Sequence, residues 1–390
     1  MNNLFVEIAS CQLAKSGNRV CGDRIITQKI PEENRYITIL SDGLGSGVKA
    51  RVLADLTASM AMHYTINHEP IERASQIILN TLPIDKEKNI GYSTFTIVDV
   101  HLDGWVNITE FDNPVVQVFK KDKPMILERK SFVVQGFGIR RSVYTFSFVL
   151  EKGDRIVLMS DGVTQSGLGT RLSPFGWGDM AVMQFIKNNI ETQSHIEASM
   201  LAKLIVERAK MNDVLKPQDD ISCTVVYLRE PRHIAIFTGP PFNEESDKKF
   251  ASQLNRYKGK KIICGGTTAQ IISRELNKSI KVNLTQKRSD LPPSSCMEGI
   301  DLVTEGIITL NRACQLLDSN SKTEDEGPAS ELVTLLLAHD RIDFYIGTRV
   351  NASHLVPNLP VELEVRRNIA RKLANILEIK HLKEINFEFF

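Results

Sequence analysis

The chain has 390 residues, which is more than one hydrophobic core usually serves, so two domains are expected. Lys and Arg number 48 against 47 Asp and Glu, and this balance creates no field that would draw the chain to nucleic acid or to an anionic membrane. No apolar run reaches the roughly 18 residues of a membrane-spanning helix, and no secretory pattern opens the sequence, so the expected location is the cytoplasm.

Short runs rich in β-branched and aromatic residues alternate with helical stretches in the first part of the chain. Strands are expected at residues 36–40, 93–100, 105–111, 115–119, 142–150, 155–160 and 222–228. Helices are expected at residues 48–67, 71–79 and 196–210, with Val52, Leu56 and Met60 on one apolar stripe of the first. Tight turn signals join many of these strands as hairpins, so this part is predicted to be an α+β domain with helices on two antiparallel sheets.

A polar segment broken by proline, Arg229-Glu230-Pro231-Arg232, separates this part from a new series of signals. It predicts two domains, residues 1–230 and 231–390. In the second, strands at 233–237 and 261–264 alternate with helices at 244–257 and 269–276, a βαβ pattern that favours a parallel sheet. The polar residues 318–330 are expected to form an exposed loop, and residues 361–380 a charged amphipathic helix.

The six cysteines are scattered singly and are interpreted as reduced thiols. The segment Cys264-Gly265-Gly266-Thr267-Thr268 lies between a strand and a helix, where backbone N–H groups could hold an anion. It satisfies neither the P-loop nor the dinucleotide fingerprint. We therefore interpret it as a turn and helix cap.

Two predicted strands of the first domain end in the same way, with an apolar run followed by Ser-Asp-Gly. The carboxylates are Asp42 and Asp161, and the glycine after each permits close backbone approach. Asp23 and the Asp219-Asp220 doublet are further acidic points. Carboxylates that meet at strand ends suit Mg²⁺ or Mn²⁺, and two such ions about 4 Å apart can activate a water for attack on phosphorus. Each acidic point alone fits an ordinary turn or surface position, so the hypothesis depends on their order and their strand context together.

The order of these motifs resembles the metal-dependent type 2C protein phosphatases, in particular the bacterial branch that includes the stage II sporulation phosphatase E. The matching segments are Gly22-Asp23, residues 41–47, residues 93–100, Asn113-Pro114, residues 150–163 and residues 219–226. They cover nearly all of residues 1–229 in the order of the family.

The resemblance implies two antiparallel sheets flanked by helices and two Mn²⁺ or Mg²⁺ ions at one edge. It implies that Asp42 bridges the ions, that the Gly43 carbonyl contributes to one of them, and that Asp161 and Asp219 complete the site. Asp23 would be a further contact to a metal or its water, and Asp220 remains an alternative to Asp219. Asp42 and Asp161 are the expected catalytic residues. Activated water would be the nucleophile, so no phosphoenzyme is expected.

The sequence departs from the family near the expected substrate contacts, where Arg24-Ile25-Ile26 replaces an aromatic-rich stretch. Arg19 or Arg24 could hold the phosphate, but a solvated surface position fits each of them as well. The implied substrate is a phosphorylated protein, with an anti-anti-sigma-like regulator as one candidate. Three functions stay open: a signalling phosphatase whose second domain regulates it or recruits substrate, a catalytically dead phospho-dependent scaffold, and a phosphatase gated by a small-molecule sensor domain.

Overall fold

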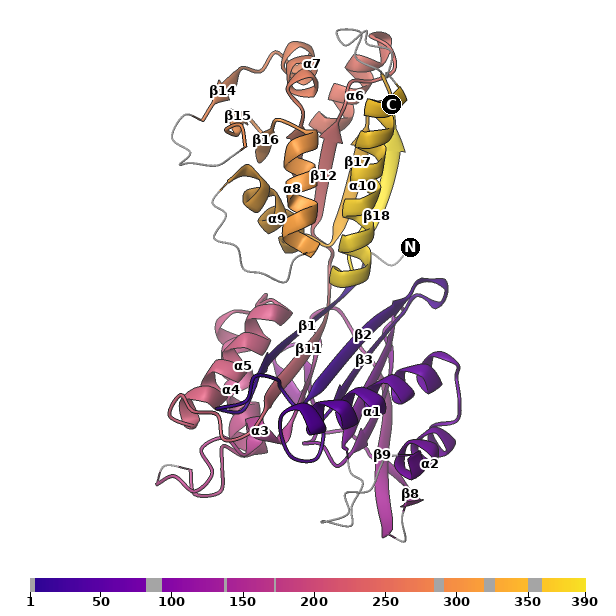
Figure 1. The fold of residues 1–390 in the computed structure, drawn as a ribbon, viewed down its shortest axis with the longest axis vertical. Helices are drawn as coiled ribbons and strands as arrows, with labels where there is room; N and C mark the ends of the chain where they lie inside the picture. The colour runs from indigo at the N-terminus through magenta and orange to yellow at the C-terminus, as the bar shows by residue number, and fades with distance from the viewer. Residues whose placement is uncertain are drawn as a thin grey trace. The chain divides into compact units, whose positions relative to one another are not determined.

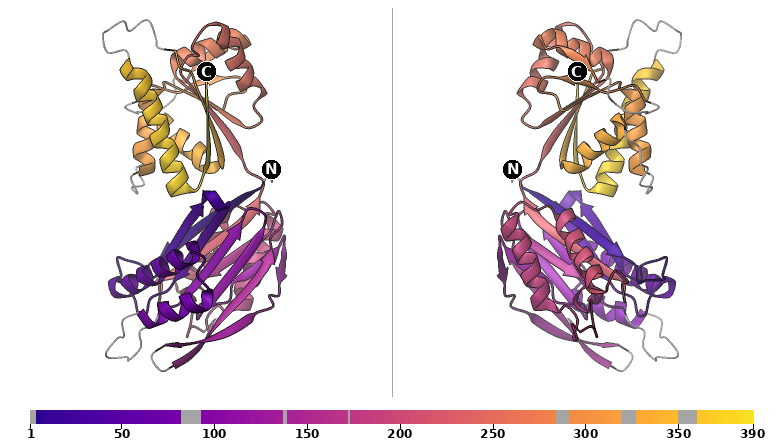
Figure 2. Two further views of the ribbon diagram at one scale, coloured as in Figure 1. Left: turned by 90° about the vertical axis from the view of Figure 1, so that its right-hand side faces the viewer. Right: turned by 90° about the vertical axis from the view of Figure 1, so that its left-hand side faces the viewer.

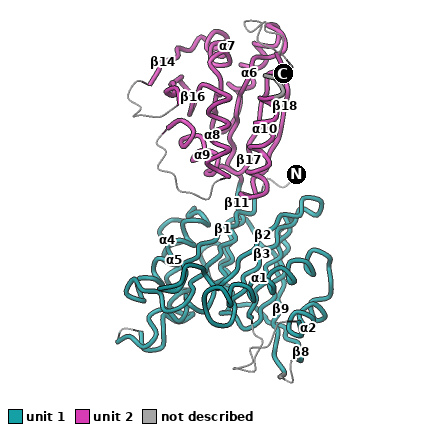
Figure 3. The backbone as a smooth tube through the Cα atoms, viewed as in Figure 1, with its two compact units in different colours: residues 1–230 teal, residues 231–390 magenta. Residues whose placement is uncertain are grey.

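The computed structural model describes residues 4–81, 93–136, 139–171, 173–283, 291–318, 327–349 and 360–390 (Figure 1). The chain divides into two compact units, Met1–Glu230 and Pro231–Phe390 (Figure 3). No helix among these described residues is long and apolar enough to cross a membrane. All six cysteines are free thiols.

The first unit contains a six-stranded sheet in which every neighbouring pair is antiparallel. In spatial order its strands are β2 (Arg24–Ile30), β3 (Arg35–Ser41), β4 (Phe95–His101), β5 (Trp105–Phe111), β9 (Ile139–Val149) and β8 (Lys130–Gly136). A 3-10 turn, η1 (Pro31–Glu33), joins β2 to β3. Every residue of β3 is buried, because Ile37 and Ile39 pack toward helices while Tyr36 and Leu40 face the other sheet.

The second sheet of this unit has five strands, again with antiparallel neighbours. In spatial order they are β1 (Phe5–Leu13), β11 (Ile221–Arg229), β10 (Arg155–Met159), β6 (Gln117–Lys120) and β7 (Lys123–Met125). Its outer face is covered by α4 (Asp179–Thr192) and α5 (Ala198–Asn212), and the short α3 (Asp161–Thr164) follows β10 (Figure 2). The predicted α+β class with two antiparallel sheets and flanking helices is therefore confirmed.

Helix α1 (Val48–Ile66) buries a different face from the one that the apolar pattern indicates. Its buried residues include Ala50, Ala54 and Ala58, whereas Val48 is 67% exposed and Val52 61% exposed. The stripe expectation is wrong because alanines let the helix backbone approach β3 closely, which a valine stripe would prevent. Helix α2 (Ile71–Thr81) then packs beside α1.

The second unit is built on a seven-stranded sheet whose core is parallel, as the βαβ pattern predicts. In spatial order its strands are β14 (Ile280–Val282), β15 (Ser295–Met297), β16 (Leu302–Thr304), β13 (Lys260–Cys264), β12 (His233–Thr238), β17 (Arg341–Ile346) and β18 (Glu384–Phe389). Among the described strands of this sheet, two neighbouring pairs are antiparallel, β14 with β15 and β15 with β16.

Helices cover both faces of the parallel core. Those on one face are α6 (Glu245–Arg256) and α7 (Gly266–Leu276). Those on the other are α8 (Ile307–Asp318), α9 (Pro328–Ala338) and α10 (Pro360–His381). The prediction of a loop over residues 318–330 is wrong at both ends, because Asp318 belongs to α8 and residues 328–330 belong to α9. Residues 319–326 lie outside the described part of the chain. In α10, Leu373 and Ile376 are buried against the sheet, as its amphipathic pattern predicts.

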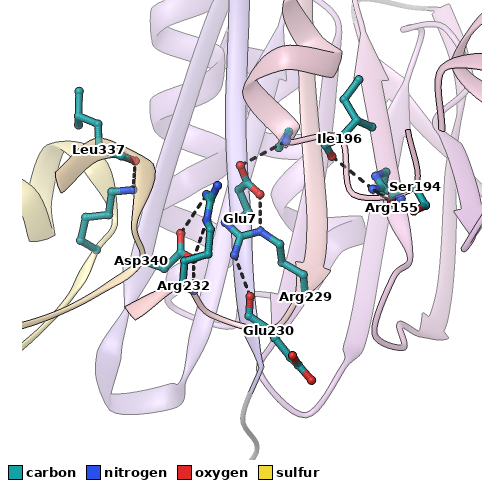
Figure 4. Close-up of polar contacts among 11 residues, drawn as sticks. Glu7, Arg155, Ser194, Ile196, Arg229, Glu230, Arg232, Leu337 and Asp340 are labelled. Carbon is teal, nitrogen blue, oxygen red and sulfur yellow. Dashed lines mark hydrogen bonds and ion pairs between the residues drawn. The ribbon is translucent and has the colours of Figure 1, made fainter. Parts of the chain in front are cut away.

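Each side of the junction between the units is fixed by an arginine within its own unit (Figure 4). The Arg229 Nε lies 2.6 Å from Glu7 Oε2 on β1, and both side chains are largely buried. The backbone N–H of Arg232 donates to Asp340 Oδ2 at 2.7 Å, just before β17. The segment between these two anchors consists of Glu230 and Pro231 alone.

Candidate functional site

Asp42 and Asp161 lie at the ends of two buried strands that belong to different sheets of the first unit. Asp42 follows β3, and Asp161 comes two residues after β10 as the first residue of α3. The charge of Asp161 raises the pKa of Asp42, and a hydrogen bond with Asp42 lowers the pKa of Asp161, so the two carboxyl groups lie close together. The structure thereby brings together residues that are 119 positions apart in the sequence.

The glycine after each aspartate is required by a close backbone contact rather than by a turn alone. A Cβ atom at Gly43 would lie 2.0 Å from the Ala50 carbonyl oxygen of α1. A Cβ atom at Gly162 would lie 2.2 Å from the Asp220 carbonyl oxygen. Any side chain at either position would push away the neighbouring element, so the two glycines hold the surroundings of both carboxylates in place.

Among these carboxyl groups, Asp42 has the pKa that is shifted furthest from its ordinary value. Burial, together with the smaller effects of the negative charges of Asp23, Asp161 and Asp219, raises the pKa of Asp42 to about 10. The pKa of Asp161 and that of Asp219 are also raised, in both cases chiefly by burial. These four carboxylates therefore share one poorly solvated region, in which their charged forms are disfavoured.

Asp23 is the most deeply buried of the predicted ligands, with 1% of its surface exposed. Burial raises its pKa to about 7, although the hydroxyls of Ser222 and Ser160 nearby lower it. Neither carboxylate oxygen of Asp23 has a hydrogen-bond partner of good geometry. A buried carboxylate whose donors are poorly placed is energetically unfavourable, so a positive charge at this position would stabilise it.

The two members of the acidic doublet have different neighbours. The charge of Asp219 acts on Asp42, whereas that of Asp220 acts on Asp23. Asp220 Oδ1 accepts the backbone N–H of Lys15 at 3.0 Å, but its buried Oδ2 has no partner. Both aspartates thus belong to the cluster, and the choice between them as a ligand stays open.

Within the described residues, no three His, Cys, Asp or Glu side chains are arranged so that they could hold a metal ion as they lie. The carboxylates of this cluster lie close together but do not form a complete ligand set as they stand. The chemistry of the cluster nevertheless fits a hard divalent cation. Three buried carboxylate oxygens, two of Asp23 and one of Asp220, have no hydrogen-bond partner of good geometry, and such cations prefer carboxylate oxygen.

Several residues that support the cluster were not identified from the sequence. Gln165 donates from Nε2 to Asp161 Oδ2 at 2.9 Å, and its spacing of four positions within a helical turn was a signal that could have revealed it. Thr94 holds the backbone of Asp42 through two hydrogen bonds, from Thr94 N–H to the Asp42 carbonyl at 2.9 Å and from Asp42 N–H to the Thr94 hydroxyl at 3.2 Å. Lys15 lies near enough for its charge to lower the pKa of Asp219. Lys15 is far from Asp219 in the sequence, so no local pattern could reveal this contact.

The two arginines considered as phosphate holders have different environments. Arg24 lies with its Nε 2.8 Å from Asp55 on α1, whereas Arg19 is exposed. A third arginine, Arg51, donates to the backbone carbonyl oxygen of Asp23 at 3.1 Å and so holds the main chain at that residue. The residue that would hold a phosphate remains a prediction.

Comparison with known proteins places the first unit in a family. The model of the family described as stage II sporulation protein E matches residues 32–229, just over half of the chain. No curated protein matches the chain.

The solved structures to which this chain is similar include the following three. The phosphatase domain of SpoIIE from Bacillus subtilis is 19% identical, with a TM-score of 0.43 over 58% of this chain and 94% of that one. RsbX in complex with magnesium is 17% identical, with a TM-score of 0.39 over 57% and 95%. A serine/threonine phosphatase of S. agalactiae is 12% identical, with a TM-score of 0.42 over 57% and 99%. From the match to the family model, the chain belongs to the stage II sporulation protein E family of type 2C phosphatases.

Proposed function

We propose that the first unit is a metal-dependent protein serine/threonine phosphatase that acts in bacterial signalling. The observation that carries the proposal is the buried carboxylate cluster, in which both oxygens of Asp23 and one of Asp220 have no hydrogen-bond partner of good geometry. A cluster of this kind destabilises the fold, because buried carboxylates without well-placed partners are unfavourable. Its presence therefore supports a function that uses the negative charge. Its position inside the unit that matches the family supports hydrolysis of a phosphate ester.

The residues proposed to hold two Mn²⁺ or Mg²⁺ ions are Asp23, Asp42, Asp161 and Asp219, with the carbonyl oxygen of Gly43. When bound, the ions supply polarisation of water and of phosphoryl oxygens. Gln165 keeps the Asp161 carboxylate in one orientation through its hydrogen bond to Oδ2. Thr94 fixes the Asp42-Gly43 backbone in the same way. Supporting contacts of this kind commonly tune affinity for the ion.

The proposed substrate is a phosphorylated protein, with an anti-anti-sigma-like regulator as the candidate. Neither nucleic acid nor membrane is proposed as a partner, since the balance of 48 basic and 47 acidic residues creates no strong field. The second unit is proposed to regulate the phosphatase or to recruit its substrate. This assignment is supported by the four proposed carboxylate ligands, all of which lie in the first unit.

The test is hydrolysis of an aryl phosphate and of matched phosphoserine, phosphothreonine and phosphotyrosine peptides. Each substrate is measured in EDTA, in Mn²⁺ and in Mg²⁺, with Asp42→Asn as the negative control and Asp122→Asn as a control outside the cluster. Cation-dependent hydrolysis of the phosphoserine or phosphothreonine peptide, lost only in Asp42→Asn, is expected. A folded, cation-loaded protein that binds these peptides but hydrolyses none of the substrates would support a catalytically dead scaffold instead.

A further inference from the structure

The sheet of the second unit has a long strand at one of its edges. Strand β18 comes last in the spatial order, and within the described part of the chain only β17 pairs with it (Figure 1). Its 6 residues pair with β17 in an unbroken parallel register, so no bulge turns this strand out of the sheet. β18 contains neither proline nor lysine, which commonly protect a sheet edge from pairing with another chain. Its outer edge can therefore accept a further strand.

The hydrogen bonds to β17 show which backbone groups of β18 point outward. The N–H of Glu384 donates to the Asp340 carbonyl at 2.8 Å, and the N–H of Phe390 donates to the Ile346 carbonyl at 2.9 Å. Backbone groups alternate between the two sides of a strand, so every second residue from Glu384 to Phe390 bonds toward β17. The residues between them direct their N–H and C=O groups outward, and they are Ile385, Phe387 and Phe389.

The side chains of β18 divide into an apolar set and a polar set. Ile385 and Phe387 pack against the cluster that includes α8, α9 and α10, and Arg367 Cζ of α10 lies 5.3 Å from the centre of the Phe389 ring. Phe389 nevertheless keeps 47% of its surface exposed. The polar residues point to the other face, because strand side chains alternate, and they are Glu384, Asn386 and Glu388.

We propose that β18 pairs in the antiparallel sense with β18 of a second copy of this chain, about a twofold axis at Phe387. Residues that bond outward then meet each other, with Phe387 opposite Phe387 and Ile385 opposite Phe389 of the other copy. Each of these pairs exchanges two backbone hydrogen bonds. Directly opposite residues share a face, so the apolar pairs lie together on the face that carries α10. On the other face Asn386 lies opposite Glu388, whose carboxylate accepts a hydrogen bond from the Asn386 amide.

The charges of β18 favour this register over its neighbours. An axis at Asn386 would place Glu384 opposite Glu388, and an axis at Glu388 would place the two copies of Glu388 opposite each other. Like charges directly opposite each other destabilise an antiparallel pair. An axis at Ile385 or at Phe389 would leave much of the strand without a partner. The axis at Phe387 pairs the strand along its length without opposing two like charges.

The proposed assembly is a closed dimer. A twofold pair uses the β18 edge of both copies, so it cannot grow into a fibre through that edge. The opposite edge of the sheet is formed by β14, which has 3 residues and carries the exposed Lys281 at its centre. Short edge strands and lysines disfavour further pairing. The dimer does not depend on the proposed phosphatase activity.

The test is sedimentation equilibrium of the full chain over a wide range of protein concentrations. A reducing buffer prevents a disulfide through the exposed Cys296. Wild-type protein is expected to form a dimer. Phe389→Glu, which places a carboxylate opposite Ile385 of the other copy, is expected to weaken the dimer at least about tenfold. Val282→Glu introduces the same side chain at an exposed apolar residue of β14, on the opposite edge of the sheet, and is expected to leave the dimer unchanged.

Lysine substitutions test the register itself. In Asn386→Lys the new side chain lies opposite Glu388, and in Glu388→Lys it lies opposite Asn386, so both variants are expected to dimerise. The double variant places lysines opposite each other and is expected to dimerise at least about tenfold more weakly than either single variant. Both positions are exposed, so melting temperatures close to that of wild type are expected.

A wild-type chain that stays monomeric at every concentration would overturn the proposal. A dimer that a folded Phe389→Glu variant leaves intact would also overturn it, because the copies would then meet through another surface. If Phe389→Glu does not fold, the lysine variants decide. A double lysine variant that dimerises as well as both single variants would show that β18 does not pair in this register.

Discussion

Replacement of Asp23 with asparagine is expected to stabilise the cation-free protein at pH 8, although Asp23 is a proposed ligand. Burial raises the pKa of this carboxyl from 3.8 to about 7. A carboxyl whose folded pKa is raised favours the folded state at low pH, and that advantage is lost as the pH rises through the folded value. The cation-free protein should therefore lose stability between about pH 4 and pH 8, and asparagine should remove the part of this loss that is due to Asp23.

The size of the effect follows from the shift. A change of about three pKa units corresponds to about 4 kcal/mol, at about 1.4 kcal/mol per unit. This is an upper bound, because the neighbouring carboxylates take up part of the change in charge and because the asparagine amide is also buried. A gain of about 1 to 4 kcal/mol in the free energy of unfolding at pH 8 is expected, with little or no gain at pH 4.

The assay is urea unfolding in EDTA at several values between pH 4 and pH 8, for wild type, Asp23→Asn and Asp122→Asn. Asp122 lies in the turn between β6 and β7, away from the cluster, and its variant should follow the wild-type curve. Addition of Mn²⁺ should stabilise wild type more than Asp23→Asn, because the variant has lost a proposed ligand. If Asp23→Asn were no more stable than wild type at pH 8, or gained equally at pH 4, the assignment of an uncompensated buried charge to Asp23 would be wrong.

Four further predictions concern the proposed chemistry and the division of the chain. Asp42→Asn and Asp161→Asn should each lose at least about a hundredfold in phosphate hydrolysis without a lower melting temperature in EDTA, and a folded variant with near wild-type turnover in saturating Mn²⁺ would contradict the site. Gln165→Leu should weaken Mn²⁺ binding about tenfold, measured by cation-dependent thermal shift, and an unchanged affinity would remove Gln165 from the support of Asp161. Rapid acid quench should trap no phosphate on the protein, whereas a covalent phosphoenzyme would refute attack by water. Residues 1–230 expressed alone should hydrolyse an aryl phosphate with Mn²⁺, and a folded, cation-binding fragment without activity would show that the second unit completes the site.

The sequence by itself determined the local elements and the positions of the carboxylates. An apolar run that ends in Ser-Asp-Gly predicts a buried strand with a carboxylate at its end, and both such runs form β3 and β10. The alternation of strands and helices after Pro231 likewise predicted a parallel sheet, since such a connection has few other arrangements. These features depend on residues close together in the chain, so a local pattern carries them.

Only the tertiary structure decided which surfaces and which charges meet. The apolar pattern indicated Val52, Leu56 and Met60 as the buried face of α1. The alanine face packs on the sheet instead, because Gly43 and Ala50 are in close backbone contact. The pKa of Asp42 is raised chiefly by burial, and also by the charges of Asp23, of Asp161 in α3 and of Asp219 before β11. No local pattern could place these groups beside it. The position of β18 at the edge of its sheet is likewise decided only when the strands are assembled, because strand order depends on non-local contacts.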